Sequence, residues 1–98
     1  MVKHIVMFRI KGNAETKKQN THMFKDKLDE LKNKIPEVKY LDTGINVSES
    51  PSSFDLVLTT HFDTSSDLDI YRNHPDHQKV VGIIKEIVNE VAVVDYSI

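Results

Sequence analysis

The chain has 98 residues, the length of one small domain, and we expect a single domain over residues 1–98. Its 39% hydrophobic and 29% charged residues are typical of a soluble globular protein, and the formal net charge of -2 gives no reason to expect nucleic acid or an anionic membrane as a partner. The sequence has no cysteine, which excludes disulfides and thiolate chemistry and suits a reducing compartment, so we expect a cytoplasmic protein. We also expect no signal peptide and no membrane span, because Met1 leads directly into a strand pattern and every apolar run is short.

Alternation between two faces from residue 2 to residue 11 predicts a first β-strand, whose apolar face contains one polar residue, His4. A helical period then runs from about Glu15 to Ile35, where Pro36 predicts the end of the helix. Two more alternating segments, joined by a polar turn, predict an antiparallel hairpin. They span residues 38–47, with Leu41, Thr43, Ile45 and Val47 on one face, and residues 54–62, with Phe54, Leu56, Leu58, Thr60 and Phe62 on one face.

The second half of the chain predicts two helices and a last strand. Thr64 suits a helix N-cap, with the acidic Asp67 three residues later, and this short helix is expected to end near Arg72. Pro75 suits the first turn of a longer helix. Residues 92–98 alternate again and predict the strand. The apolar stripe of the longer helix contains His77, Val81, Ile84 and Val88, with Val80, Ile83, Ile87 and Val91 beside it.

This order of elements, β-α-β-β-α-β, is that of an α+β protein with the ferredoxin-like arrangement, in which the helices cover one face of the sheet. The faces with His4, Val6 and Leu58 are the better candidates for the covered side. The opposite face retains exposed apolar residues, which often mark an interaction surface, and a second copy packed on it would cover them. We therefore expect a homodimer joined through the sheet faces. The apolar residues assigned to this open face are Ile5, Met7, Val57 and Val93.

The residues best suited to chemistry are Tyr71, His77 and His4. His77 lies on an apolar helical stripe, and an imidazole that exchanges its proton near pH 7 suits general acid–base catalysis. Alternatively, His77 is a buried histidine satisfied by one hydrogen bond, for instance to Tyr71. His4 must find a partner if it is buried, either in a ligand or in the core. Tyr71 either orients His77 or a ligand, or is a core aromatic residue with one polar end.

No cofactor or metal is expected. His74 and His77 have a spacing that can hold a metal, but neither a carboxylate nor a cysteine partner is evident, so we expect His74 to serve at the junction between the two helices. The chain shows no glycine-rich phosphate loop, no Ser-His-Asp order and no zinc spacing. His22 lies off the apolar stripe of its helix and is expected to be exposed, and His61 is expected on the dimer face.

Several segments taken together resemble the stress-responsive A/B barrel family, the dimeric α/β-barrel (Dabb) domains, over nearly the whole chain. The resemblance implies a ferredoxin-like protomer whose sheet packs on a second copy to close a barrel, with a cavity between sheet and helices. Most members of this family have no assigned reaction. The segments are Val2–Arg9, Phe54–Leu58, Tyr71, His74–His77 with the His-Pro-x-His pattern, and Val93–Tyr96.

A plant branch of the family, which this chain resembles, includes polyketide cyclases that use a tyrosine and the last histidine of the His-Pro-x-His pattern. The resemblance places those catalytic roles on Tyr71 and His77, with His4 lining the same cavity. Leu56 and Leu28 stand where the cyclases have a histidine and an aromatic residue. The ligand-binding residues expected on this basis are His4, Val6, Phe24, Leu28, Leu56, Leu58, Tyr71 and His77.

Three functions are compatible with these observations. The first is binding of a small, partly apolar molecule in the cavity between sheet and helices. The second is a cyclase-like or isomerase-like enzyme that uses His77 as general acid or base with Tyr71. The third is a structural, stress-protective oligomer without a ligand. A cavity able to hold a ligand, typically ~300 Å³ or more, would favour the first two functions over the third.

Overall fold

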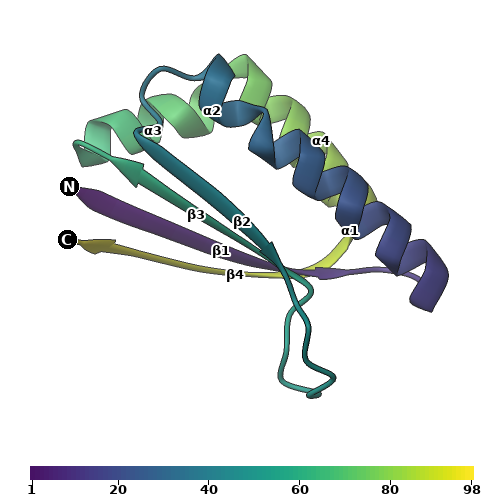
Figure 1. Ribbon diagram of the computed structural model, residues 1–98. Coiled ribbons are helices and arrows are strands. Elements are labelled where there is room, and N and C mark those ends of the chain that lie inside the picture. Colours follow the sequence, from purple (N-terminus) through teal and green to yellow (C-terminus); the bar gives the residue numbers. More distant parts are fainter.

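The computed structural model covers residues 1–98, and its four strands form one antiparallel sheet in the order β2-β3-β1-β4. All four helices lie on one face of this sheet and leave the other face open (Figure 1). This is the ferredoxin-like arrangement that the sequence predicts. The elements are β1 (Val2–Ile10), α1 (Ala14–Asp29), α2 (Leu31–Lys34), β2 (Tyr40–Ile45), β3 (Leu56–Phe62), α3 (Ser65–Asn73), α4 (Pro75–Ile87) and β4 (Val88–Ser97).

The core lies between the central strands and the helices. Every second residue of β1 from His4 to Ile10 is buried, and so is every second residue of β3 from Leu56 to Phe62. Helix α1 adds Phe24, whose ring meets that of Phe8 edge to face at 5.0 Å. Burial of each such large apolar side chain contributes about 1.5–3 kcal/mol. The predicted inward faces of β1 and β3 are confirmed.

The start of β4 differs from the prediction. Helix α4 ends at Ile87, and Val88 is already extended although its N–H still bonds to the Ile84 carbonyl. The helix therefore passes into the strand without a loop. The predicted helical stripe through Val88 and Val91 was wrong, because valine suits a strand better than a helix and the valine spacing allows both.

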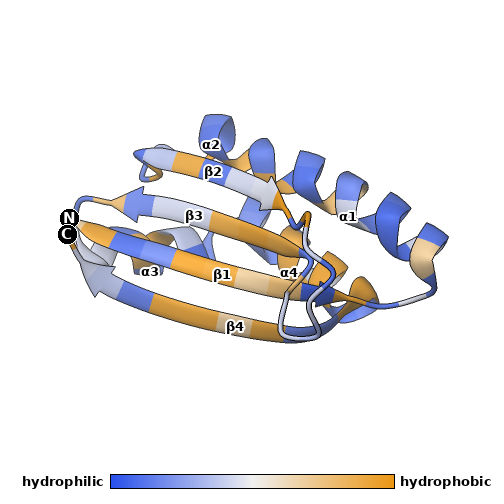
Figure 2. Cartoon of the chain, turned by 60° about the horizontal axis from the view of Figure 1, so that its bottom comes forward, coloured by the Kyte–Doolittle hydropathy of each residue, from blue (hydrophilic) through white to orange (hydrophobic).

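The register of β4 corrects a second prediction. Val93 lies opposite Val6 and Val94 lies opposite Ile5. Directly paired residues of an antiparallel sheet point to the same face, so Val93 belongs to the helix-covered side and not to the open face. Figure 2 shows the open side, where apolar segments run along β1, β3 and β4. The apolar residues there are Ile5, Met7, Val57, Ala92 and Val94, with Tyr40 and Tyr96 at the edges.

The hairpin strands β2 and β3 are shorter than predicted. Val47 was expected to share one face of β2 with Leu41, Thr43 and Ile45. The strand ends at Ile45, however, and Val47 is 99% exposed in the loop that follows. Phe54 likewise precedes β3, and it packs its ring under the Arg9 guanidinium at 4.1 Å. The serine-rich segment between the strands forms turns instead of extending the ladder.

The junction between α3 and α4 positions the aromatic and histidine residues of interest. The Thr64 hydroxyl accepts a hydrogen bond from the Asp67 N–H at 3.1 Å, which caps α3 as predicted. The imidazole Nδ1 of His74 accepts from the Asp76 N–H at 3.1 Å and caps α4, whose first residue is Pro75.

None of the four helices combines the length and the hydropathy that a membrane crossing requires.

Candidate functional site

A cavity of about 290 Å³ lies between the helix-covered face of the sheet and helices α3 and α4. Its walls are mostly apolar, with residues of β1, β3, β4, α1 and α4 contributing. Four polar side chains border it: His4 from β1, Tyr71 and Arg72 from α3, and His77 from α4. An apolar hollow with a few convergent polar groups is the usual form of a small-molecule site.

The structure brings together most of the residues that the sequence selected. Phe24 and Leu56 are the exceptions. Phe24 is fully buried against Phe8. Leu56 lies two residues before Leu58 in β3, opposite Phe8 and Ile45, and borders a different hollow. Both are therefore core residues outside this cavity. The predicted residues that do line it are His4, Val6, Leu28, Leu58, Tyr71 and His77.

Sequence reasoning missed the contribution of β4. Val91 and Val93 form part of the cavity wall, with Ile84 of α4 opposite them. They were missed because β4 was expected to begin later and Val93 was placed on the wrong face. The ferredoxin-like strand order signals that β4 pairs with β1, but the register that places Asp95 opposite His4 comes from the structure.

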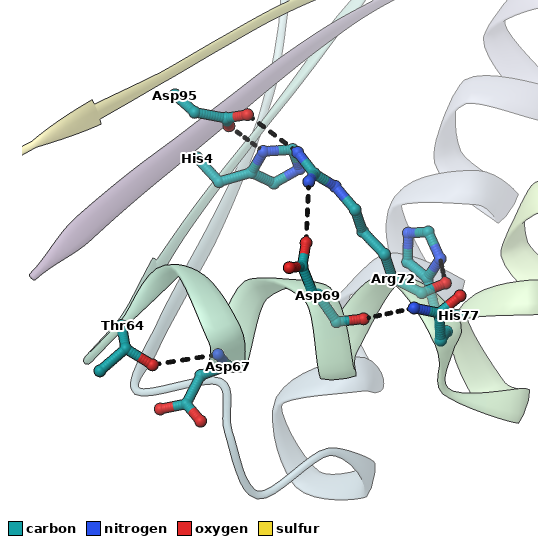
Figure 3. Close-up of polar contacts among 8 residues, drawn as sticks. His4, Thr64, Asp67, Asp69, Arg72, His77 and Asp95 are labelled. Atoms are coloured by element: carbon teal, nitrogen blue, oxygen red, sulfur yellow. Dashed lines mark hydrogen bonds and ion pairs between the residues drawn. The ribbon is translucent and has the colours of Figure 1, made fainter.

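Asp95 links His4 to Arg72 (Figure 3). One carboxylate oxygen of Asp95 bonds to Nδ1 of the buried His4 ring, and the other accepts from Nη2 of Arg72 at 2.9 Å. Arg72 also lies 3.4 Å from the exposed Asp69 carboxylate. An ionised carboxylate only accepts hydrogen bonds, so the His4 proton in this bond is on Nδ1. Nε2 of His4 has no hydrogen-bond partner in the chain.

His77 is held in a similar way by the backbone. Its Nδ1 lies 3.0 Å from the carbonyl oxygen of Arg72, and since a carbonyl can only accept, Nδ1 is the donor. Burial lowers the pKa of His77 below its usual value of 6.5, while the bond to the Arg72 carbonyl acts in the opposite direction and the nearby His4, Arg72 and His74 lower it further. The neutral ring therefore keeps a lone pair on Nε2, which can accept a proton.

Tyr71 is fully buried, and its hydroxyl has no hydrogen-bond partner. Its ring packs against those of His77 and Phe62, with centroid distances of 4.5 Å and 5.0 Å. The hydrogen bond between Tyr71 and His77 that the sequence left open is not formed. Burial raises the pKa of Tyr71 far above its usual value, so the phenol stays protonated and can donate a hydrogen bond.

The Nδ1 atoms of His74 and His77 already bond to backbone groups, and the chain contains no cluster of three or more His, Cys, Asp or Glu side chains that could hold a metal ion.

The fold and the cavity define a small ferredoxin-like protein with a pocket beneath its helices. Residues 2–98 match the family described as Stress responsive A/B Barrel Domain, and the chain belongs to this family. It is 28% identical over 104 residues to a stress-response A/B barrel domain-containing protein of Arabidopsis thaliana, with 98% of this chain but only 36% of that protein covered. The chain thus spans about a third of the length of that relative. An uncharacterized protein of Streptomyces coelicolor is 23% identical over 97 residues, with 99% of each covered.

Solved structures share the fold. A dimeric protein of unknown function and ferredoxin-like fold from Bacteroides fragilis superposes with a TM-score of 0.90 at 29% identity, covering 99% of this chain and 95% of that one. The hydroxynitrile lyase from Passiflora edulis superposes with a TM-score of 0.84 at 19% identity, covering 99% of this chain and 92% of that one. At this lower identity the likeness concerns the fold alone.

Replacement of Tyr71 by phenylalanine should not destabilise the protein. A buried hydroxyl without a partner costs about 1–3 kcal/mol, so its removal should leave the free energy of unfolding unchanged or raise it by up to about 1 kcal/mol. Urea denaturation followed by circular dichroism measures this. Tyr71→Ala, the control that also removes the ring, should lose about 3–5 kcal/mol. A loss of more than about 1 kcal/mol in Tyr71→Phe would show that the hydroxyl has a partner.

His77 should titrate at a lower pH in the folded protein than in the urea-unfolded chain, as measured by NMR of its ring protons. Because its folded pKa is depressed, the unfolded chain binds more protons in this window. Stability from His77 is therefore complete above about pH 6.5 and falls as the pH drops toward the folded pKa. Urea melts at pH 7.5 and pH 5.5 should show a larger loss for the wild type than for His77→Gln. Equal losses would contradict the assignment.

Proposed function

We propose that this protein is a dimeric α/β-barrel protein of the stress-responsive family that binds a small, partly apolar molecule in the cavity between sheet and helices. The observation that carries the proposal is a mostly apolar cavity bordered by His4 and His77, whose Nε2 atoms have no hydrogen-bond partner in the chain. Buried polar groups in folded proteins nearly always have a partner, and a ligand in the cavity can supply one.

The lining of the cavity supports a ligand more than its size does. At about 290 Å³ it lies just below the usual range of small-molecule sites. Its wall is mostly apolar, and the two imidazoles that border it each keep an Nε2 atom without a partner in the chain, which a bound molecule can use.

The open face of the sheet supports the dimeric part of the proposal. Met7 is 38% exposed and Val94 53% exposed on this face, beside the partly exposed Ile5 and Val57. An exposed apolar sheet face of this kind often marks a surface that another protein surface covers. The Bacteroides fragilis protein of the same fold, 29% identical, is described as dimeric.

A bulky residue at the cavity wall should abolish ligand binding. Val93 is 55% exposed on β4, so Val93→Trp can reach into the cavity without disturbing the core. Ligand-observed NMR with a library of small, partly apolar compounds should find binders to the wild type whose affinity falls at least about tenfold in this variant. Ile70→Trp is the matched control, because Ile70 is 49% exposed on α3 and lies outside the cavity. Binding that survives Val93→Trp would place the ligand elsewhere.

Met7→Lys should weaken the dimer, because it places a charge among apolar residues of the buried interface. Sedimentation at micromolar concentration should give about twice 11.3 kDa for the wild type and a lower average mass for the variant. Met23→Lys is the matched control: Met23 is also 38% exposed but lies on α1, on the other side of the molecule. A wild type that sediments as a monomer would refute the dimer.

An enzymatic role is the second candidate, and the geometry of His77 favours it. Its ring is oriented by the Arg72 carbonyl and kept neutral by burial, which leaves Nε2 able to take a proton from a bound substrate. If a carbonyl substrate that can form an enol is turned over, His77→Ala should reduce the rate by ~10²–10⁴. His22→Ala, a change at an exposed position on α1, should leave it unaltered. Turnover that survives His77→Ala would leave binding as the function.

A further inference from the structure

We infer that the cavity selects a neutral ligand with a hydroxyl group on an apolar body, and that Arg72 is the residue that sets this preference. The inference rests on the proposed ligand-binding function and adds the chemical class of the ligand. It follows from which ring nitrogens of His4 and His77 are already occupied. Arg72 holds the Asp95 carboxylate that bonds to His4, and its backbone carbonyl accepts from His77.

Arg72 fixes the two imidazoles through two different groups. Its guanidinium holds the Asp95 carboxylate, whose other oxygen bonds to Nδ1 of His4. Its backbone carbonyl accepts from Nδ1 of His77. In both rings Nδ1 is thus the donor, and the remaining Nε2 atom is an acceptor when the ring is neutral.

The free polar atoms around the cavity therefore form a defined set. Neither Nε2 has a hydrogen-bond partner in the chain, and neither is among the fully buried atoms that lack one, so both retain access. The Tyr71 ring lies beside both imidazoles, with ring-centroid distances of 6.2 Å to His4 and 4.5 Å to His77, but its hydroxyl is fully buried and gives a ligand no donor. The cavity thus offers two acceptors.

A hydroxyl group satisfies this set, because it donates a hydrogen bond to an imidazole lone pair. A second hydroxyl would satisfy the other ring. A carboxylate can only accept, so it would face two lone pairs with no accessible donor. The charges nearby also oppose an anion, since Arg72 is balanced by both Asp69 and Asp95. A methyl ether would leave both lone pairs unsatisfied.

The position of Asp95 explains why Arg72 controls the preference. The Asp95 side chain is 30% exposed at the rim, and apart from His4 its only ionic partner is Arg72. Without the guanidinium this carboxylate is free to rotate toward water. His4 can then carry its proton on either nitrogen, and its Nε2 is no longer held as an acceptor.

The first test is made on the ligand-free protein. Long-range proton–nitrogen NMR at pH 8 distinguishes the two neutral forms of each histidine, and His4→Gln and His77→Gln assign the signals. We expect the proton on Nδ1 in both rings, and in Arg72→Met a mixture of the two forms for His4 with His77 unchanged. Arg72→Lys, which can still pair with Asp95, should restore the wild-type form. A proton on Nε2 of either ring in the wild type would overturn the inference.

The second test compares three matched probes: 4-propylphenol, 4-propylanisole and 4-propylbenzoate. By calorimetry, the phenol should bind the wild type at least about tenfold more tightly than either analogue, because an unpaired buried polar group is costly. Arg72→Met should reduce that ratio, and Arg72→Lys should keep it. Benzoate binding as tight as phenol binding would overturn the inference alone. Failure of all three probes to bind, with the expected histidine forms, would overturn the proposed binding function together with it.

Discussion

The pairing of β1 with β4 is the constraint on which the site depends. It places Asp95 opposite His4 and Val93 opposite Val6, so that one edge strand supplies both the carboxylate that orients a ring and part of the apolar wall. The register shifts between Arg9 and Ile10, next to the point where α4 becomes β4. Because side chains alternate along a strand, a slip of one residue would move Val93 and Asp95 to the open face, which removes Val93 from the cavity wall and Asp95 from His4.

The buried polar groups beside the cavity lower the stability of this small domain. Only 17 of its 98 residues are buried, so the core is modest. An unpartnered hydroxyl costs about 1–3 kcal/mol against a typical total stability of about 5–15 kcal/mol. Under the proposed function, a ligand in the cavity and a second copy on the open face would each stabilise the folded chain.

The sequence predicted the parts of the fold that follow from local periodicity. Alternation identified the inward faces of β1 and β3, and the caps at Thr64 and Pro75 located α3 and α4. The same periodicity failed at Val88 and Val91, because the valine spacing fits both a helix and a strand, and only the packing of β4 on β1 decides between them. Arg72 and Asp95 were not recognised as site residues for a related reason. They are 23 positions apart, and their contact depends on the register of a strand whose start had been misplaced.

The direct passage from α4 into β4 has a consequence for access to the cavity. The N–H of Lys11 bonds to the Ile87 carbonyl at 2.8 Å, so the point where the two elements meet is anchored to the end of β1. From this point α4 and β4 diverge (Figure 1). At the wide end, the ion pair between Arg72 and Asp95 is the one hydrogen-bonded link from the helices to β4. β4 is thus joined to the helices by the chain itself at one end and by this ion pair at the other. The ion pair is made by the same arginine of α3 that orients the two histidine rings.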